Sequence, residues 1–259
     1  MSANGFTRSV RAGVKRLVHA VRARAGGSSP AASSPAHPLA GDLERLFPDG
    51  AATVFDVGAY VGEFAVLTHR AFPTARVWCF EPFPASYERI RARFSAADWV
   101  QVHNFGLSDR DGRAELIIGA DQSTNSIVSP VITNGAFASG LPRTTITLKT
   151  LSACAQEFLG RDPQLSILKV DTEGNDLAVL KGGEELLRAT SIEAIHVEVM
   201  FLEHFKGAAG FLEIAQYLQQ FGYRLFSLYD LKRNPQGQLR YGNALFLSPH
   251  RQEFAGIAR

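Results

Sequence analysis

The chain contains little cysteine and no long apolar run. Two cysteines, Cys79 and Cys154, stand far apart in its 259 residues. This excludes the dense disulfide framework of a small secreted domain, and no cysteine or histidine spacing typical of a metal site is present. Cys79 lies inside an apolar segment, which is typical of a buried, reduced thiol. No apolar run approaches the roughly 18 residues of a membrane-spanning helix. We therefore expect a cytoplasmic protein without a transmembrane segment.

A strong excess of one charge is also missing. The formal net charge is +2, which gives no reason to expect a nucleic-acid partner. The hydrophobic fraction of 46% supports a full core. A chain of this length suits one large α/β domain with a short additional segment.

The additional segment is N-terminal and basic. Residues 8–24 carry six lysines and arginines, and the first acidic residue is Asp42. Apolar residues recur there at helical spacing, but the apolar core of a signal peptide is lacking. A single basic amphipathic helix binds lipid weakly, so a solvated or domain-packed helix is favoured over a weak membrane-surface contact. Residues 26–38 read as a flexible Gly/Ser/Pro/Ala linker. We place this segment at 1–38 and the main domain at 39–259.

The most informative stretch is Thr53–Phe64. A β-branched and aromatic run, Thr53–Val57, predicts a buried strand, and a helical pattern begins near Phe64. Gly58 and Gly62 lie between them. A strand, a glycine-rich turn and a helix together bring bare backbone N–H groups up to a polar ligand.

An acidic residue follows at the spacing of a nucleoside-binding fold. Glu81 ends the next predicted strand, 81 − 58 = 23 residues after Gly58. A carboxylate roughly 20 residues past the glycine turn binds ribose hydroxyls in such folds. A dinucleotide fingerprint also needs glycine at the third and sixth positions of the turn, where this chain has Tyr60 and Glu63. The sequence therefore disfavours a pyrophosphate-containing cofactor and a nucleotide-dependent oxidoreductase.

The remaining periodicities predict a doubly wound α/β fold with alternating strands and helices. The middle of the chain reads as a β-hairpin excursion, and the end reads as an antiparallel pair of strands. The expected strands are 53–57, 76–80, 99–104, 113–118, 143–148, 167–170, 192–199, 223–229 and 240–247. The expected helices are 42–47, 63–71, 85–94, 151–159, 177–181 and 210–221.

Acidic side chains gather again after the strand 167–170. Asp171 stands at its carboxyl end, where open α/β sheets bind ligands, and Glu173 follows in the turn. Asn175 or Asp176 could cap the following helix. Capping would explain the presence of Asp176, but it would not explain Asp171. Glu198 lies in a strand that we expect to be central, where an unpaired charge is costly.

Several of these segments resemble the FkbM-type methyltransferases, which use S-adenosylmethionine. The first motif, Asp56-x-Gly58-x-x-x-Gly62, is shared by many methyltransferases, whereas Lys169-Val-Asp-x-Glu-Gly174 followed by Leu180-Lys-Gly182 is more specific. Further matches are Phe80-Glu-Pro82, 104–112 and 197–199, so the resemblance spans about 53–248. Tyr60 is a departure, because this family more often has asparagine there.

The resemblance implies a seven-stranded Rossmann-like methyltransferase fold and methyl transfer to a hydroxyl of a sugar or polyketide-like acceptor. We expect the general base among three residues: Asp171 first, then His204, then Glu198. His196 is favoured as a core histidine. Asp171, Glu173 and Glu198 together are a less favoured alternative as ligands of a divalent cation. We expect the cofactor site to be formed by Asp56, Gly58, Ala59, Tyr60, Gly62, Glu81, Pro82, Asn104, Ser108 and Asp171.

Two other functions stay open at this point. One is a non-catalytic binding protein that keeps the methyltransferase fold, and the less favoured one is the oxidoreductase. The presence of four acids argues for a working site rather than a decayed one; they are Asp56, Glu81, Asp171 and Glu173. Nothing in the loops 121–139 or 201–210 favours a glycan over another small-molecule acceptor.

Overall fold

The computed structural model describes residues 37–119, 122–129 and 140–256. The predicted basic N-terminal helix and most of the predicted linker lie outside these residues. The described helices are α2 (Pro38–Leu46), α3 (Glu63–Ala71), α4 (Pro84–Arg93), η1 (Gln122–Thr124), α5 (Leu151–Leu159), α6 (Asp176–Lys181), α7 (Glu184–Arg188), α8 (Phe211–Gln219) and α9 (Pro249–Phe254). The strands are β1 (Thr53–Val57), β2 (Arg76–Phe80), β3 (Val100–His103), β4 (Gly106–Ser108), β5 (Gly112–Ile117), β6 (Arg143–Thr150), β7 (Leu165–Val170), β8 (Ile192–Met200), β9 (Arg224–Arg233) and β10 (Leu239–Leu247).

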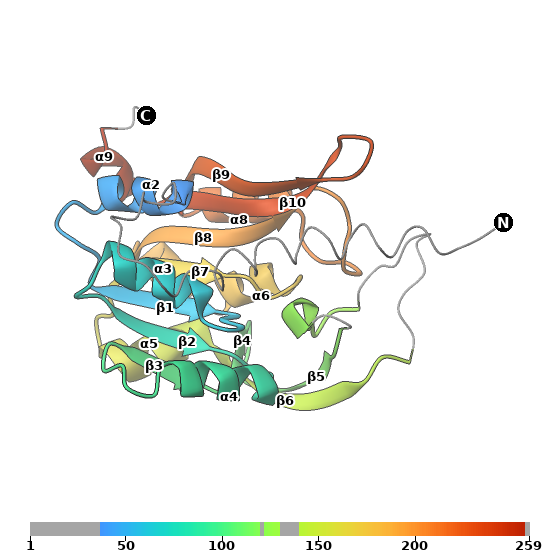
Figure 1. The fold of residues 1–259 in the computed structure, drawn as a ribbon. Helices are drawn as coiled ribbons and strands as arrows, with labels where there is room; N and C mark the ends of the chain where they lie inside the picture. The colour runs from blue at the N-terminus through green and yellow to red at the C-terminus, as the bar shows by residue number, and fades with distance from the viewer. Residues whose placement is uncertain (1–36, 120–121, 130–139, 257–259) are drawn as a thin grey trace, which may run out of the picture. The chain divides into compact units, whose positions relative to one another are not determined.

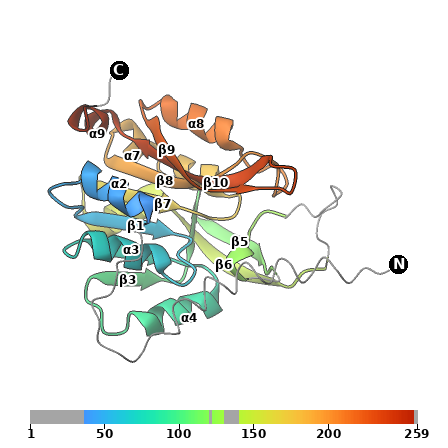
Figure 2. The same cartoon turned by 45° about the horizontal axis from the view of Figure 1, so that its top comes forward.

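A seven-stranded sheet forms the centre of the domain, with the order β3-β2-β1-β7-β8-β10-β9. Strands β3, β2, β1, β7 and β8 are parallel, and β10 runs antiparallel to both β8 and β9. The predicted doubly wound fold with an antiparallel final strand is confirmed. Figure 2 shows α8, β9 and β10 on the side of the domain opposite β3 and α4.

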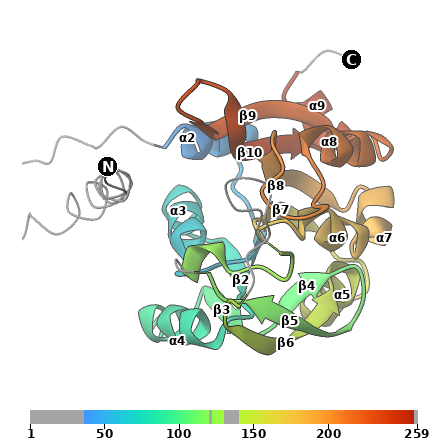
Figure 3. The same cartoon turned by 90° about the vertical axis from the view of Figure 1, so that its right-hand side faces the viewer.

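Helices cover both faces of this sheet, as its apolar strands require. In Figure 3, α3 and α4 lie on one side of the strands, and α5, α6, α7 and α8 lie on the other. Side chains of β1 alternate between the two layers: Val54 belongs to the core under α2, α3 and α4, and Phe55 belongs to the core under α5, α6 and α8. Strand β7, which is buried along its full length, packs in the same way.

A second sheet has three strands in the order β4-β6-β5 (Figure 1). The predicted hairpin is present, because β5 and β6 pair antiparallel. Between the expected strands 99–104 and 113–118, the structure has a further short strand that the sequence analysis did not predict: β4, which pairs parallel with β6. The small sheet has its own core of Phe83, Leu116, Ile146 and Leu148.

The order of strands reverses between β1 and β7, which places a ligand crevice at their carboxyl ends. Val57 and Val170 end these strands side by side. The residues that follow them, Gly58 and Asp171, are therefore neighbours. Within the ranges that the structure describes, no helix is long and apolar enough to cross a bilayer.

Candidate active site

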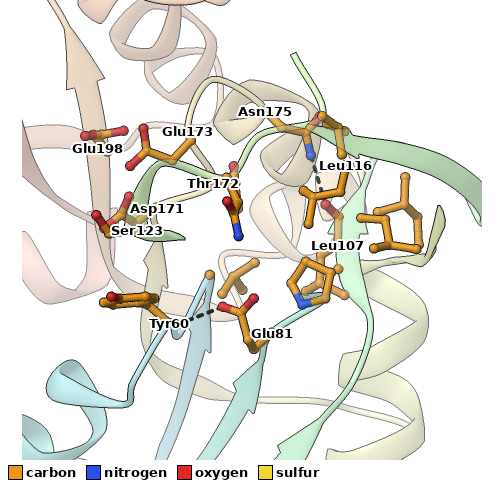
Figure 4. A pocket seen from close by; sticks show the side chains of 18 residues that line it. Tyr60, Glu81, Leu107, Leu116, Ser123, Asp171, Thr172, Glu173, Asn175 and Glu198 are labelled. Atoms are coloured by element: carbon orange, nitrogen blue, oxygen red, sulfur yellow. Dashed lines mark hydrogen bonds between the residues drawn. The ribbon is translucent and has the colours of Figure 1, made fainter. Parts of the chain in front are cut away.

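A cavity opens at the carboxyl ends of β1, β2, β7 and β8, and the small sheet forms one of its walls (Figure 4). This wall is apolar: Leu107, Leu116, Ile146 and Leu148 come from the small sheet, and Pro82 and Ile127 add to the apolar lining. The polar residues of the lining are Tyr60, Glu81, Ser123, Asn125, Asp171, Thr172, Glu173, Asn175 and Glu198. Val57, Gly58 and Gly106 complete the lining. An apolar slot beside a few converging polar groups is typical of a site for a small organic ligand.

Both glycines of the turn have a positive φ and leave no room for a side chain. Gly58 has a φ of +74°, and a Cβ there would lie 1.9 Å from the carbonyl oxygen of Asp171. Gly62 has a φ of +77°, and a Cβ there would lie 2.5 Å from the ring of Phe94. Tyr60 also has a positive φ, of 49°. Asparagine tolerates this left-handed conformation better than most residues, so the tyrosine at this position is held in a less favourable backbone conformation.

Glu81 connects this turn to the next strand. Its Oε2 accepts a hydrogen bond from Tyr60 N at 2.8 Å, and its Oε1 accepts one from Phe83 N at 2.9 Å. The side chain lines the cavity although only 7% of the residue is exposed. Burial raises the pKa of Glu81 to about 7, and the two backbone hydrogen bonds limit the rise. The carboxyl group is thus fixed in one orientation and keeps acceptor capacity toward the cavity.

Lys169 is a buried cation beneath the cavity that the sequence analysis did not single out. Its Nζ lies 3.1 Å from Asp56 Oδ1 and 3.7 Å from Asp171 Oδ2, and it donates to the Gly58 carbonyl at 2.6 Å. Burial alone would lower its pKa, but Asp56 and Asp171 outweigh burial and raise it. The lysine therefore stays charged and ties the end of β1 to the end of β7. Lys169 lies directly opposite Asp56 in the pairing of β1 with β7, and this non-local register is not visible in the sequence.

Asp56 does not have the position that the sequence predicts. It is fully buried and is not among the described residues that line the cavity. Burial raises its pKa, and Lys169 opposes this rise. Asp56 thus acts as the counter-charge of Lys169 below the glycine turn, and its expected direct contact with the cofactor is not supported.

The turn after β7 is held by Asp176. Its carboxylate accepts from Thr172 N at 2.8 Å, Thr172 Oγ1 at 3.0 Å and Gly174 N at 3.2 Å. Burial raises its pKa to about 6. Of the two capping candidates, Asn175 occupies the N-cap position of α6 but makes no side-chain capping bond, and its side chain instead donates to the Leu107 carbonyl at 3.0 Å. This turn therefore positions Asp171 and Glu173 and also anchors β4.

Three carboxylates converge where the turn after β7 meets β8. Oxygen atoms of Asp171, Glu173 and Glu198 all lie within 4.8 Å of one another, and Figure 4 shows the three side chains together. The pKa of Glu198 is well above its ordinary value because of burial and, secondarily, the neighbouring charges of Asp171 and Glu173. The predicted proximity of these three residues is present.

Other predicted site residues lie around the cavity rather than in its described lining. Ala59 belongs to the core under α2, α3 and α4, and Asn104 donates to the carbonyls of Glu81 and Pro82 at 3.0 and 3.1 Å. Ser108 is buried, and its hydroxyl lies 3.4 Å from Asn175 Oδ1. Like Gly62, these residues shape the backbone that forms the site.

His204 is a weaker candidate base than the sequence implies. It is not among the described lining residues. Its Nδ1 lies 2.7 Å from the Leu202 carbonyl, and its ring packs edge-on against Tyr241. Burial lowers its pKa. His196 is a buried residue that stacks on Phe64, with burial lowering its pKa to about 3.

Comparison with known proteins places this site in a family. Residues 56–225 match the family described as "Methyltransferase FkbM domain". The chain belongs to this family of S-adenosylmethionine-dependent methyltransferases, so S-adenosylmethionine is the cofactor that the site has to accommodate.

The relatives include two named enzymes. Methyltransferase sdnD of Sordaria araneosa is 30% identical over 156 residues, which cover 51% of this chain and 60% of that protein. Hexuronic acid methyltransferase AglP of Haloferax volcanii is 28% identical over 160 residues, covering 60% and 61%. The chain thus spans about 60% of the length of these relatives. A solved structure, magnesium protoporphyrin IX methyltransferase (ChlM) from Synechocystis PCC 6803 with bound SAM, is 9% identical with a TM-score of 0.47 and covers 96% of this chain and 86% of that one.

Proposed function

We propose that this protein is an S-adenosylmethionine-dependent O-methyltransferase that acts on a hydroxyl group of a small molecule or glycan. One observation carries the proposal. Glu81 at the end of β2 and Asp171 at the end of β7 line the same cavity, with the glycine turn beside both. One relative is named a hexuronic acid methyltransferase, which supports a sugar among the candidate acceptors.

The residues present fit the cofactor. Glu81 has free acceptor capacity for ribose hydroxyls, because each carboxylate oxygen receives only one backbone hydrogen bond. The apolar wall contributed by Leu107, Leu116 and Leu148 suits the faces of an adenine ring. Gly58 lets the backbone approach the amino-acid end without a side chain in the way. When bound, the cofactor supplies a methyl group on a positively charged sulfonium.

Asp171 is the first candidate for the general base. A neutral alcohol is a weak nucleophile, so a nearby carboxylate that accepts its proton as the new carbon–oxygen bond forms lowers the barrier. Lys169, 3.7 Å below, restrains the Asp171 carboxylate from the protein side. Glu198 lines the same part of the cavity and ranks second, ahead of His204. Much of the rate enhancement would come from alignment of the acceptor oxygen.

Two substitutions test this assignment. Glu81→Ala removes the ribose acceptor, and we expect the affinity for S-adenosylhomocysteine to fall at least about tenfold. Asp171→Asn keeps the shape of the site, so this affinity should stay within a few-fold while turnover falls about 10²–10⁴-fold. Glu88→Gln, on the exposed face of α4, serves as the control.

Calorimetric titration gives the affinities, and S-adenosylhomocysteine release with a panel of sugar and polyketide-like alcohols gives the turnover. Unchanged affinity in Glu81→Ala would contradict the cofactor assignment. Tight binding without turnover on any acceptor would favour the non-catalytic alternative instead.

A further inference from the structure

Asp171, Glu173 and Glu198 form a carboxylate cluster that the proposed base chemistry does not fully use. A single general base needs one carboxylate, whereas three lie within 4.8 Å of one another. They come from two adjacent strands: Asp171 and Glu173 from the turn after β7, and Glu198 from β8. Negative charges this close repel one another unless a cation or proton lies among them.

Glu198 supplies a second, independent observation. Its Oε2 is shielded from solvent and has no hydrogen-bond partner among the described residues. A buried carboxylate oxygen without a partner is strongly unfavourable, so a partner from outside the chain is indicated. Figure 4 shows the Glu198 side chain directed toward Glu173, into the part of the cavity that Asp171 also lines.

Glu198 has no positively charged side chain beside it in the described lining of the cavity. The described residues that line the cavity include no lysine, arginine or histidine. Lys169 approaches Asp171 from below at 3.7 Å, but it is closer to Asp56, at 3.1 Å, and also binds the Gly58 carbonyl. Its charge is thus shared between two carboxylates before Glu198 is counted.

We propose that the carboxylate cluster binds a divalent cation of the Mg²⁺ or Mn²⁺ type. Carboxylate oxygens are the ligands that these hard cations prefer, and they commonly keep coordination positions for water or substrate oxygens. The role of the site rests on the proposed function: a cation here would hold the acceptor hydroxyl and lower its pKa. The cation site would favour acceptors with two neighbouring oxygen atoms, since such pairs can occupy adjacent coordination positions.

Binding of Mn²⁺ to the full chain tests the site without any acceptor. We expect calorimetry and electron paramagnetic resonance to show one bound Mn²⁺ per chain. Glu198→Gln should weaken binding at least about tenfold, because it removes one charged ligand. Glu88→Gln, an exposed acid of α4 that pairs with Arg91, should bind Mn²⁺ as the wild type does. If Glu198→Gln does not fold, Glu173→Gln provides the same test.

S-adenosylhomocysteine titration of the same samples separates this inference from the proposed function. Intact S-adenosylhomocysteine binding without Mn²⁺ or Mg²⁺ binding in the millimolar range would overturn the cation site and leave the methyltransferase assignment standing. Equal Mn²⁺ affinity in wild type and Glu198→Gln would also overturn it. Mn²⁺ binding that depends on Glu198, in a protein that fails to bind S-adenosylhomocysteine, would support the cation site and contradict the proposed function.

Discussion

At the residue scale, the most consequential side chain is Lys169. It is 6% exposed, pairs with the fully buried Asp56, and holds the Gly58 carbonyl at 2.6 Å. The pair connects two neighbouring strands at the level where the cavity begins. Removing either partner leaves an uncompensated charge in the core, which is far less favourable than removing both.

Lys169→Met should therefore lower the free energy of unfolding by about 3–5 kcal/mol. Adding Asp56→Asn to this variant removes the orphaned charge, so the double variant should recover part of the loss. Urea denaturation at pH 7 measures both. If the double variant is no more stable than Lys169→Met alone, charge burial is not the cause of the loss.

Glu81 gives the protein a pH-dependent stability of defined sign. Its pKa rises from 4.5 to about 7 on folding, so the folded state holds the proton more tightly than the unfolded state. The resulting stabilisation is complete below about pH 4.5, is lost as the pH rises toward 7, and stays absent above it. A shift of this size corresponds to at most about 3 kcal/mol.

Glu81→Gln cannot ionise and should escape this loss. We expect the stability of wild type, relative to Glu81→Gln, to fall between pH 4.5 and pH 8 in urea denaturation without ligand. Because other titrating groups are common to both proteins, their contributions cancel in the comparison. Parallel pH profiles would show that the Glu81 carboxyl is not perturbed by folding.

The sequence identified the side chains at the ends of strands better than those within them. Glu81 and Asp171 follow directly from strand-end positions, and both line the cavity. Asp56 sits two residues before the equivalent position of β1, Gly58, and its side chain is buried inside the strand. Lys169 was overlooked because a lysine in an apolar strand has no local signature. Its role depends on Asp56, 113 residues away in sequence.

At the scale of the elements, the end of α6 packs closely against β4. The contact is made by Gly182, the last residue of the Leu180-Lys-Gly182 motif. A Cβ on Gly182 would lie 2.0 Å from the carbonyl oxygen of Ser108. The backbone of Gly182 is ordinary, with a φ of −63°. This glycine is therefore required by the close approach of two elements and not by its own conformation.

Gly182→Ala should destabilise the protein by about 2–3 kcal/mol, because the backbone of β4 has to move. Gly41→Ala is the matched control, since it lies inside α2 with no atom within 4 Å of the added Cβ. There we expect stabilisation of about 0.5–1 kcal/mol from helix propensity. Thermal or urea denaturation of both variants measures the difference. Equal effects would mean that β4 yields to the extra methyl group.

The elements that periodicity predicted best are the long regular ones. α3, α5, β1 and β2 have the predicted limits because each is bounded by glycine, proline or a clear change of pattern. β4 was missed because three residues carry too little periodicity, and its pairing with β6 is non-local. α7 was missed because it directly follows two glycines and is only five residues long.

At the scale of the whole domain, the cavity is formed by two sheets. The sequence predicts strands of each sheet, but it does not predict that the two sheets meet at the cavity. The large sheet contributes the acids and the glycine turn, and these follow from a known rule for parallel strands. The apolar wall comes from Leu116 on β5 and from Ile146 and Leu148 on β6. Alternation predicted the two strands, but no local pattern indicates that their apolar face closes a cavity over the ends of β1 and β2.

This arrangement predicts where a bound ligand should rigidify the protein. Among the described residues, the core of the small sheet has four buried members, so we expect this sheet to open more readily than the large one. S-adenosylhomocysteine contacting Leu116, Ile146 and Leu148 would oppose this opening, since a ligand stabilises the state that binds it. Hydrogen exchange with and without the ligand should show the largest slowing in β5 and β6. β9, which contributes no described residue to the cavity lining, should change little. Equal slowing in β9 would indicate global stabilisation, and no slowing in β5 and β6 would mean that their apolar face is not part of the cofactor site.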